Sequence, residues 1–283
     1  MTTRAPQGRT RPGAADLQVG RPGVVWALPA ALFFGLFALL PMVLVLVLSF
    51  TQWSGLGSPE FVGTENWSRL LDDPVMLKSI GLSLVLTALG VVTQTPVAML
   101  LGVWAAGHQW NRAVLDPNFG VPAQMEWLFG DGNLFGNQST AIAVLVFVSL
   151  WQFTPLHALI YQGAAKAVPP MLYEAAEIDG AGRVRSFFAI TLPQLRNTMI
   201  TSVILMVVGG LTTFDTVLIL TNGGPGTDTT ITAFYMYQKA FRGFDFGLAS
   251  AIAVVLVVAA TAISLVMVRL SGYDKMRSEL EGV

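Results

Sequence analysis

Four polar side chains interrupt long apolar stretches of this sequence and are its first candidates for chemistry: Gln94, Gln152, His157 and Asp215. A polar group inside a membrane-spanning stretch needs a partner, either on a neighbouring helix or in a wet cavity. Gln94, Gln152 and Asp215 are therefore candidate contacts for a solute. Hydrogen bonding between helices is the other interpretation of Gln94. His157 has no carboxylate or second histidine at a motif spacing, which favours a structural role.

Asp215 differs from the two glutamines in its expected depth. Along a continuous helix, at a rise of ~1.5 Å per residue, it lies roughly 30 Å from Arg196. That distance places it near a membrane interface rather than at the midplane. Both a functional role and simple solvation of the carboxylate fit this position.

Several kinds of chemistry are excluded by motifs that the sequence lacks. It contains no GxxxxGK[ST] phosphate loop, no HExxH and no GxSxG, so we expect neither an enzyme nor a chain that binds ATP itself. It has no cysteine and a formal net charge of −1. No metal, cofactor or nucleic-acid partner is therefore expected.

The elements that position these residues are transmembrane helices, because 53% of the residues are hydrophobic and only 12% are charged. The pattern predicts an all-α polytopic membrane protein whose membrane domain covers residues 24–268. A basic, disordered cytoplasmic tail is expected at 1–23 and a second cytoplasmic tail at 269–283. The predicted spans are 24–50, 79–107, 140–161, 197–220 and 246–268.

The segment 168–196 separates two of these spans and has its own pattern. Pro169 and Pro170 favour a helix start, and Gly180 favours a left-handed residue just past its end, so a short helix is predicted over 170–179. A second short helix follows, and Pro193 breaks or kinks the chain. The first helix is amphipathic. One sector holds Met171, Leu172, Ala175, Ala176 and Ile178, and the other holds Tyr173, Glu174 and Glu177.

Three groups of residues in this segment carry a family resemblance: Glu174-Ala175-Ala176, Asp179-Gly180-Ala181-Gly182 and Ile190-x-Leu192-Pro193. Their order and spacing resemble the cytoplasmic coupling loop of permease subunits of binding-protein-dependent ABC importers. The resemblance implies that a separate ATPase dimer holds this loop and moves the membrane helices. It assigns coupling to Glu174, Ala175, Ala176, Asp179, Gly180, Gly182, Leu192 and Pro193. An amphipathic hairpin at the membrane surface, without a partner, is the alternative.

A second resemblance lies beyond the fourth span, in the turn NGGPGTDTT and the following FYMYQKAF. These stretches resemble the carbohydrate-uptake branch of the same family. The resemblance implies import of a sugar or a related polyol compound such as glycerol phosphate across a bacterial inner membrane. It also implies a second, homologous permease chain and an extracytoplasmic solute-binding protein as partners, with membrane lipid around the helices.

The number of spans disagrees with this resemblance, because the family has a six-helix core and the sequence shows five apolar runs. With one more crossing between Arg112 and Ser139, twelve of the sixteen Lys and Arg residues lie inside, as the positive-inside rule favours. The four outside are Arg69, Lys78, Lys239 and Arg242. No apolar run exists there, so we hypothesise that a third helix of roughly twenty residues is missing at Leu115–Asp116.

Three other interpretations stay open. The chain could be an impaired permease that lacks one helix. It could instead be an ion-coupled secondary transporter, although neither midplane ionisable groups nor internal repeats are clear in the sequence. A membrane scaffold is the third, but a scaffold has no need of the coupling loop.

Overall fold

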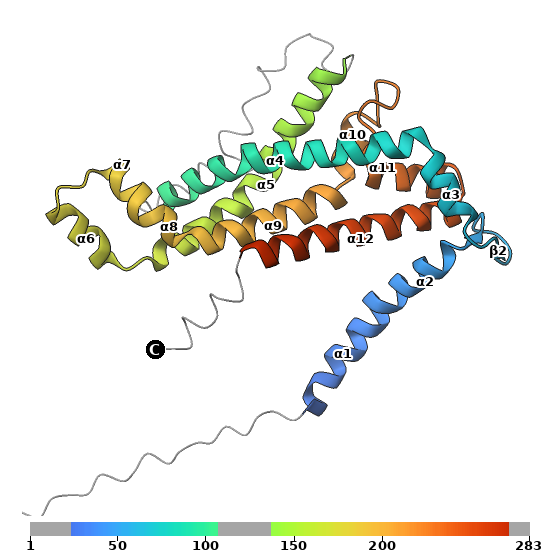
Figure 1. Ribbon diagram of the computed structural model, residues 1–283, viewed down its shortest axis with the longest axis horizontal. Coiled ribbons are helices and arrows are strands. Elements are labelled where there is room, and N and C mark those ends of the chain that lie inside the picture. The colour runs from blue at the N-terminus through green and yellow to red at the C-terminus, as the bar shows by residue number, and fades with distance from the viewer. Residues whose placement is uncertain (1–23, 107–136, 272–283) are drawn as a thin grey trace, which may run out of the picture. The chain divides into compact units, whose positions relative to one another are not determined.

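The computed structural model describes residues 24–106 and 137–271 of a mostly helical protein (Figure 1). The chain divides into two units, residues 1–44 and 45–283. The described residues of the first unit form η1 (Val24–Ala27), α1 (Leu28–Phe34), the π-helix η2 (Gly35–Leu39) and the start of α2 (Leu40–Leu48). The uncharged stretch Leu28–Leu48 is 21 residues long, which is enough to cross a membrane.

Two long helices, α4 (Pro74–Ala106) and α5 (Gln138–Ala167), form the centre of the second unit. Each begins at a side-chain cap. The Asp73 carboxylate accepts from the Val75 amide at 2.9 Å, and Pro74 takes the first helical position, where its missing N–H costs nothing. The Asn137 side chain accepts from the Ser139 amide at 2.9 Å. The caps explain why both helices start earlier than the predicted spans at 79 and 140, with Lys78 inside α4.

The α4 and α5 helices run parallel to each other. Leu82 and Leu145 share one apolar cluster, and Ala98 and Tyr161 share another farther along both helices. Gly102 allows the close approach, because a Cβ there would lie 2.5 Å from the Ala158 carbonyl oxygen. The chain therefore leaves α4 at one end of the bundle and enters α5 at the other.

The predicted fourth span, 197–220, is wrong as a single helix. Two helices cover this range instead: α9 (Arg196–Thr212) ends within it, and α10 (Asp215–Leu220) begins after Thr213 and Phe214. Thr213 has extended backbone (φ −68°, ψ 130°), and both its amide and its Oγ1 donate to the Gly209 carbonyl at 2.8 Å. The side chain thus completes a helix end inside a stretch that is apolar by composition.

The end of the bundle that carries α3 (Glu65–Asp72), termed the α3 end, is held together by strand pairing and by buried hydrogen bonds. A two-stranded antiparallel sheet joins β1 (Thr51–Gln52) to β2 (Glu60–Phe61). The buried Asn66 amide donates to the carbonyls of Ser49 at 3.1 Å and Thr51 at 2.8 Å. Gly247 lies against the same strand, since a Cβ there would lie 1.9 Å from the Thr51 oxygen.

The turn and aromatic stretch after α10 also belong to the α3 end. Asn222, Gly223 and Gly226 have positive φ, as the turn chemistry predicts. The aromatic stretch that follows the turn lies in α11 (Thr232–Tyr237) and the π-helix η6 (Gln238–Arg242). Phe234 on α11 is fully buried against neighbouring helices. The last helix, α12 (Phe246–Ser271), then runs back along α9.

The opposite end, termed the α6 end, carries α6 (Pro170–Ile178), α7 (Arg183–Ser186), the π-helix η5 (Phe187–Thr191) and α8 (Leu192–Gln194) (Figure 1). Among the described residues, four helices could cross a membrane, or five if the bent pair 183–194 and 196–212 counts as one span. The hypothesis of a missing third helix concerns residues outside the described ranges, as do the predicted tails up to residue 23 and from 272.

Candidate functional site

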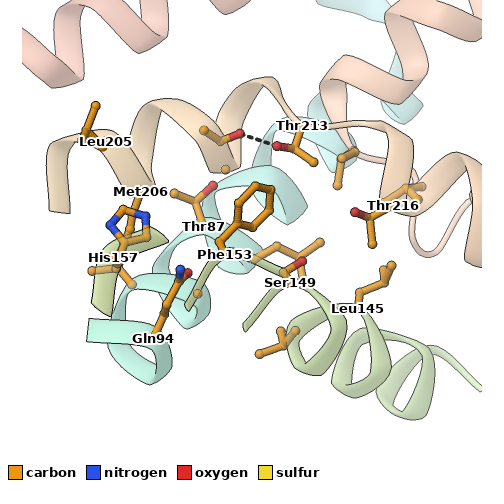
Figure 2. A pocket seen from close by; sticks show the side chains of 18 of the residues that line it. Thr87, Gln94, Leu145, Ser149, Phe153, His157, Leu205, Met206, Thr213 and Thr216 are labelled. Carbon is orange, nitrogen blue, oxygen red and sulfur yellow. Dashed lines mark hydrogen bonds between the residues drawn. The ribbon is translucent and has the colours of Figure 1, made fainter. Parts of the chain in front are cut away.

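A cavity of about 280 Å³ lies among α4, α5, α9 and α10 in the second unit (Figure 2). Most of its lining is apolar. No charged side chain occurs among its lining residues in the described part of the chain. The polar lining residues are Thr87, Gln94, Ser149, His157, Thr213 and Thr216.

Gln94 is the predicted site residue that this cavity contains. Its side chain is 5% exposed, and its Nε2 makes no hydrogen bond within the described residues. The buried Thr87 Oγ1, on the same helix, has no partner there either. Buried polar groups are nearly always paired, so these two atoms keep hydrogen-bonding capacity for another polar group, as do Trp67 Nε1, Thr154 Oγ1 and the Tyr161 hydroxyl outside the lining.

His157 has a structural bond as well as a place in the lining. Its Nδ1 lies 2.8 Å from the Ser202 Oγ, which joins α5 to α9 within the bundle. The histidine is buried. This agrees with the structural role that its isolation in the sequence predicted.

Gln152 and Asp215, the other two predicted solute contacts, do not line the cavity. Gln152 is exposed and accepts a long hydrogen bond of 3.5 Å from Thr216 Oγ1. Asp215 is the exposed first residue of α10. The structure brings Gln94 together instead with hydroxyl groups, above all Thr87 and Thr213, which the sequence interpretation missed.

The coupling segment 168–196 lies far along the bundle from the helix break, at the α6 end. Its first helix, α6, ends in a Schellman motif: the Gly180 amide donates to the Glu177 carbonyl at 3.0 Å, and the Ala181 amide donates to the Ala176 carbonyl at 2.8 Å. Gly180 has φ +72°, so the predicted left-handed glycine is confirmed. The chain bends by 67° between the 183–194 stretch and α9.

The sectors predicted for α6 need correction at three residues. Tyr173 is half-buried, packs with Leu172 on the cluster around Tyr161, and joins its hydroxyl to Thr191 Oγ1 at 2.9 Å. A phenol ring can pack while its hydroxyl bonds, so its place in the polar sector was wrong. Met171 and Ile178, expected in the packed sector, are instead 68% and 87% exposed.

The remaining predicted coupling residues are mostly on the surface. The exposed ones are Glu174, Ala175, Asp179, Gly180, Gly182 and Pro193, whereas Ala176 and Leu192 are half-buried. The exposed face of α6 therefore mixes two carboxylates with the apolar side chains of Met171 and Ile178. A helix of nine residues is not stable alone in water, so this face suits a second protein surface.

Charged groups gather at the α3 end, away from the cavity. Arg69 pairs with Asp245 at 2.7 Å, and Lys239 lies 3.7 Å from Asp73. Burial raises the pKa of Asp73, but the bonds from the Tyr235 hydroxyl and the Val75 amide outweigh it and leave this pKa below its ordinary value. Burial, and then Asp73, raise the pKa of Tyr235.

Comparisons with known proteins agree with one another. The family described as "Binding-protein-dependent transport system inner membrane component" matches residues 19–273. The Bacillus subtilis "Probable ABC transporter permease protein YurN" is 31% identical, over 84% of this chain and 92% of that protein. The Agrobacterium fabrum "Sulfoquinovosyl glycerol transport system permease protein SmoG" is 30% identical, over 86% and 87%.

A solved structure shows the same fold. It is the crystal structure of a bacterial ABC transporter that imports the acidic polysaccharide alginate. The TM-score is 0.71 at 20% sequence identity, and the match covers 87% of this chain and 93% of that one.

Proposed function

The chain belongs to the family of binding-protein-dependent transport system inner membrane components, and from that membership we propose that it is the permease subunit of an ATP-driven importer of carbohydrates. It is a multi-pass membrane protein of the transporter class rather than a catalytic enzyme. The carbohydrate class is supported by SmoG, whose name specifies a sugar linked to glycerol, and by the Streptococcus mutans "Multiple sugar-binding transport system permease protein MsmF", which is 31% identical over 83% of this chain.

One observation carries the mechanism: the coupling segment continues directly into a wall of the cavity. After the 67° bend, α9 contributes Leu205, Met206 and Gly209 to the lining. A rigid helix transmits a displacement at one end to the other. Movement of α6 by a partner at the α6 end would therefore shift the cavity wall relative to α4 and α5.

The partner proposed for α6 is a cytoplasmic ABC ATPase dimer, and the contact residues are Glu174, Ala175, Ala176, Asp179, Gly180, Gly182, Leu192 and Pro193. The exposed apolar side chains on α6 support this proposal, because the surface of a bound protein would cover them. ATP binding would draw two such dimer-linked segments together, and hydrolysis would release them.

The sidedness that this requires is supported by the charges of the segment 168–196. Arg183, Arg185 and Arg196 lie in it, and the positive-inside rule favours the cytosol for them. The parallel course of α4 and α5 means that both helices run from the α3 end to the α6 end. We therefore propose that the α6 end faces the cytosol and the α3 end faces the solute-binding protein.

A second, homologous permease chain is proposed to complete the pathway. Leu156 and Leu205 line the cavity and are nevertheless 55% and 50% exposed, so the cavity opens between α5 and α9. An apolar opening of this kind suits the surface of a second membrane subunit. Each chain would then provide half of the pathway.

Expression of this chain with the products of its neighbouring genes tests the proposal. We expect an ATPase to co-purify and reconstituted vesicles to take up sugar only with ATP. Gly180→Pro should abolish both, because proline cannot adopt φ +72° and lacks the N–H that bonds to Glu177. Sugar uptake driven by an ion gradient, without an ATPase, would refute it.

A further inference from the structure

The cavity is polar without being charged. Its apolar walls carry the Gln94 carboxamide, the His157 imidazole, which is bonded to Ser202, and the hydroxyls of Thr87, Ser149, Thr213 and Thr216. Its described lining contains no Lys, Arg, Asp or Glu. An anion that entered from water would lose its hydration and meet no cation on this chain's half of the pathway. Transfer of an unpaired charge into such surroundings is strongly unfavourable.

Two of the polar atoms in this cavity lack partners. Gln94 Nε2 and Thr87 Oγ1 make no hydrogen bond within the described residues, although both side chains are more than nine-tenths buried. Carboxamides and hydroxyls complement sugar hydroxyls, since each can donate and accept. A neutral ligand that supplies such hydroxyls removes the cost of leaving these two atoms unpaired.

An aromatic side chain completes the lining. Phe153 of α5 points into the cavity that Gln94 of α4 also enters (Figure 2). A sugar ring has an apolar C–H face that packs on a phenyl ring, while its edge carries hydroxyls. The volume of about 280 Å³ is small beside the ~300–1,000 Å³ of typical small-molecule sites, which favours one ring over a chain of several.

We propose that this cavity is a subsite for a single uncharged sugar ring, in which Gln94 Nε2 and Thr87 Oγ1 hydrogen-bond to ring hydroxyls and Phe153 covers the apolar face. The proposal rests on the proposed transport function. It predicts discrimination against uronate and phosphorylated sugars on this half of the pathway. The alginate importer, by contrast, handles an acidic polysaccharide.

The test uses the purified complex of this chain with its companion subunits, in a detergent without a sugar headgroup. Neutral methyl glycosides and the matching uronates are titrated, and the rise in melting temperature gives the affinity of each. We expect protection by a neutral glycoside and little by its uronate. Gln94→Leu should weaken binding of the neutral glycoside about three- to tenfold, which is the range for the loss of one hydrogen bond.

Thr93→Val is the matched control, since Thr93 precedes Gln94 on α4, does not line the cavity and bonds to the Leu89 carbonyl of its own helix. The affinity of the Thr93→Val complex for the neutral glycoside should equal that of the wild-type complex. If Gln94→Leu does not assemble, the nearly isosteric Thr87→Val decides, with the same expected weakening. Unchanged affinity in these variants, equal binding of uronates, or no binding of any neutral glycoside overturns the proposal. ATP-dependent uptake by the wild-type complex judges the transport function separately.

Discussion

Replacing Gln94 by leucine should stabilise the ligand-free protein, although it removes a polar contact for the solute. The Gln94 side chain is 5% exposed and its Nε2 has no hydrogen-bond partner within the described residues. A buried polar group without a partner costs about 1–3 kcal/mol. Leucine has a similar volume and no polar atom, so most of this cost is recovered.

We take the lower limit of that range, because the cavity opens between α5 and α9. The expected gain is about 1 kcal/mol, which corresponds to roughly 2–4 °C in melting temperature for a chain of this size. Thermal unfolding of the purified complex without sugar, followed by tryptophan fluorescence, measures it.

Asn66→Leu is the matched contrast, because it also removes a buried carboxamide. The Asn66 amide donates to the carbonyls of Ser49 and Thr51, so its loss leaves two acceptors without their donor. We expect a destabilisation of about 2 kcal/mol or more. A loss of stability in Gln94→Leu similar to that in Asn66→Leu would refute the reasoning, because it would mean that the Gln94 amide is already paired in the folded protein.

Three further predictions concern the two ends of the bundle. Gly180→Ala should reduce ATP-driven uptake several-fold, since a left-handed alanine costs about 1–2 kcal/mol, whereas Gly163→Ala should transport normally because Gly163 lies inside α5 and the space around it is open. Gly247→Ala should lower the free energy of unfolding by about 3 kcal/mol, because its Cβ would overlap the Thr51 oxygen, and thermal unfolding measures this. Acid should destabilise the protein through Asp73: the lowered pKa means that its contribution is complete above the ordinary value of 3.8 and is lost as the pH falls below it, and Asp73→Asn should flatten this part of a stability-versus-pH curve.

Each of these three has a contradicting result. Equal uptake by the Gly180 and Gly163 variants would show that the left-handed turn is unimportant for coupling. A fully stable Gly247→Ala protein would show that the strand can move away from α12. An acid limb that is unchanged in Asp73→Asn would assign the acid sensitivity to other carboxylates.

The sequence predicted the parts of the fold that depend on local pattern. The left-handed Gly180 was predictable because few residue types other than glycine tolerate positive φ at a helix end. Gln94 was found because a carboxamide stands out in an apolar run. Tyr173 was misplaced because a helical wheel counts phenol as either polar or apolar, whereas it packs its ring and bonds its hydroxyl at once.

The helix break and the rest of the cavity lining were not predictable in the same way. Average hydropathy does not indicate the extended backbone at Thr213, because that conformation depends on a hydrogen bond from the Thr213 side chain to the Gly209 carbonyl. Threonine hydroxyls inside helices usually bond to their own backbone, as Thr93 does. Those that remain unpaired, such as Thr87, are distinguished only by what packs around them.

The exposed apolar side chains of α6 make the chain prone to aggregation when it is produced in excess over its partner subunits. A copy inserted in the membrane before the proposed ATPase binds would present Met171 and Ile178 to water, next to a solvent-accessible turn that ends at Gly180. Such a copy is a substrate for aggregation and for proteases. Degradation of copies without a partner would then keep the amount of permease equal to the amount of the proposed ATPase.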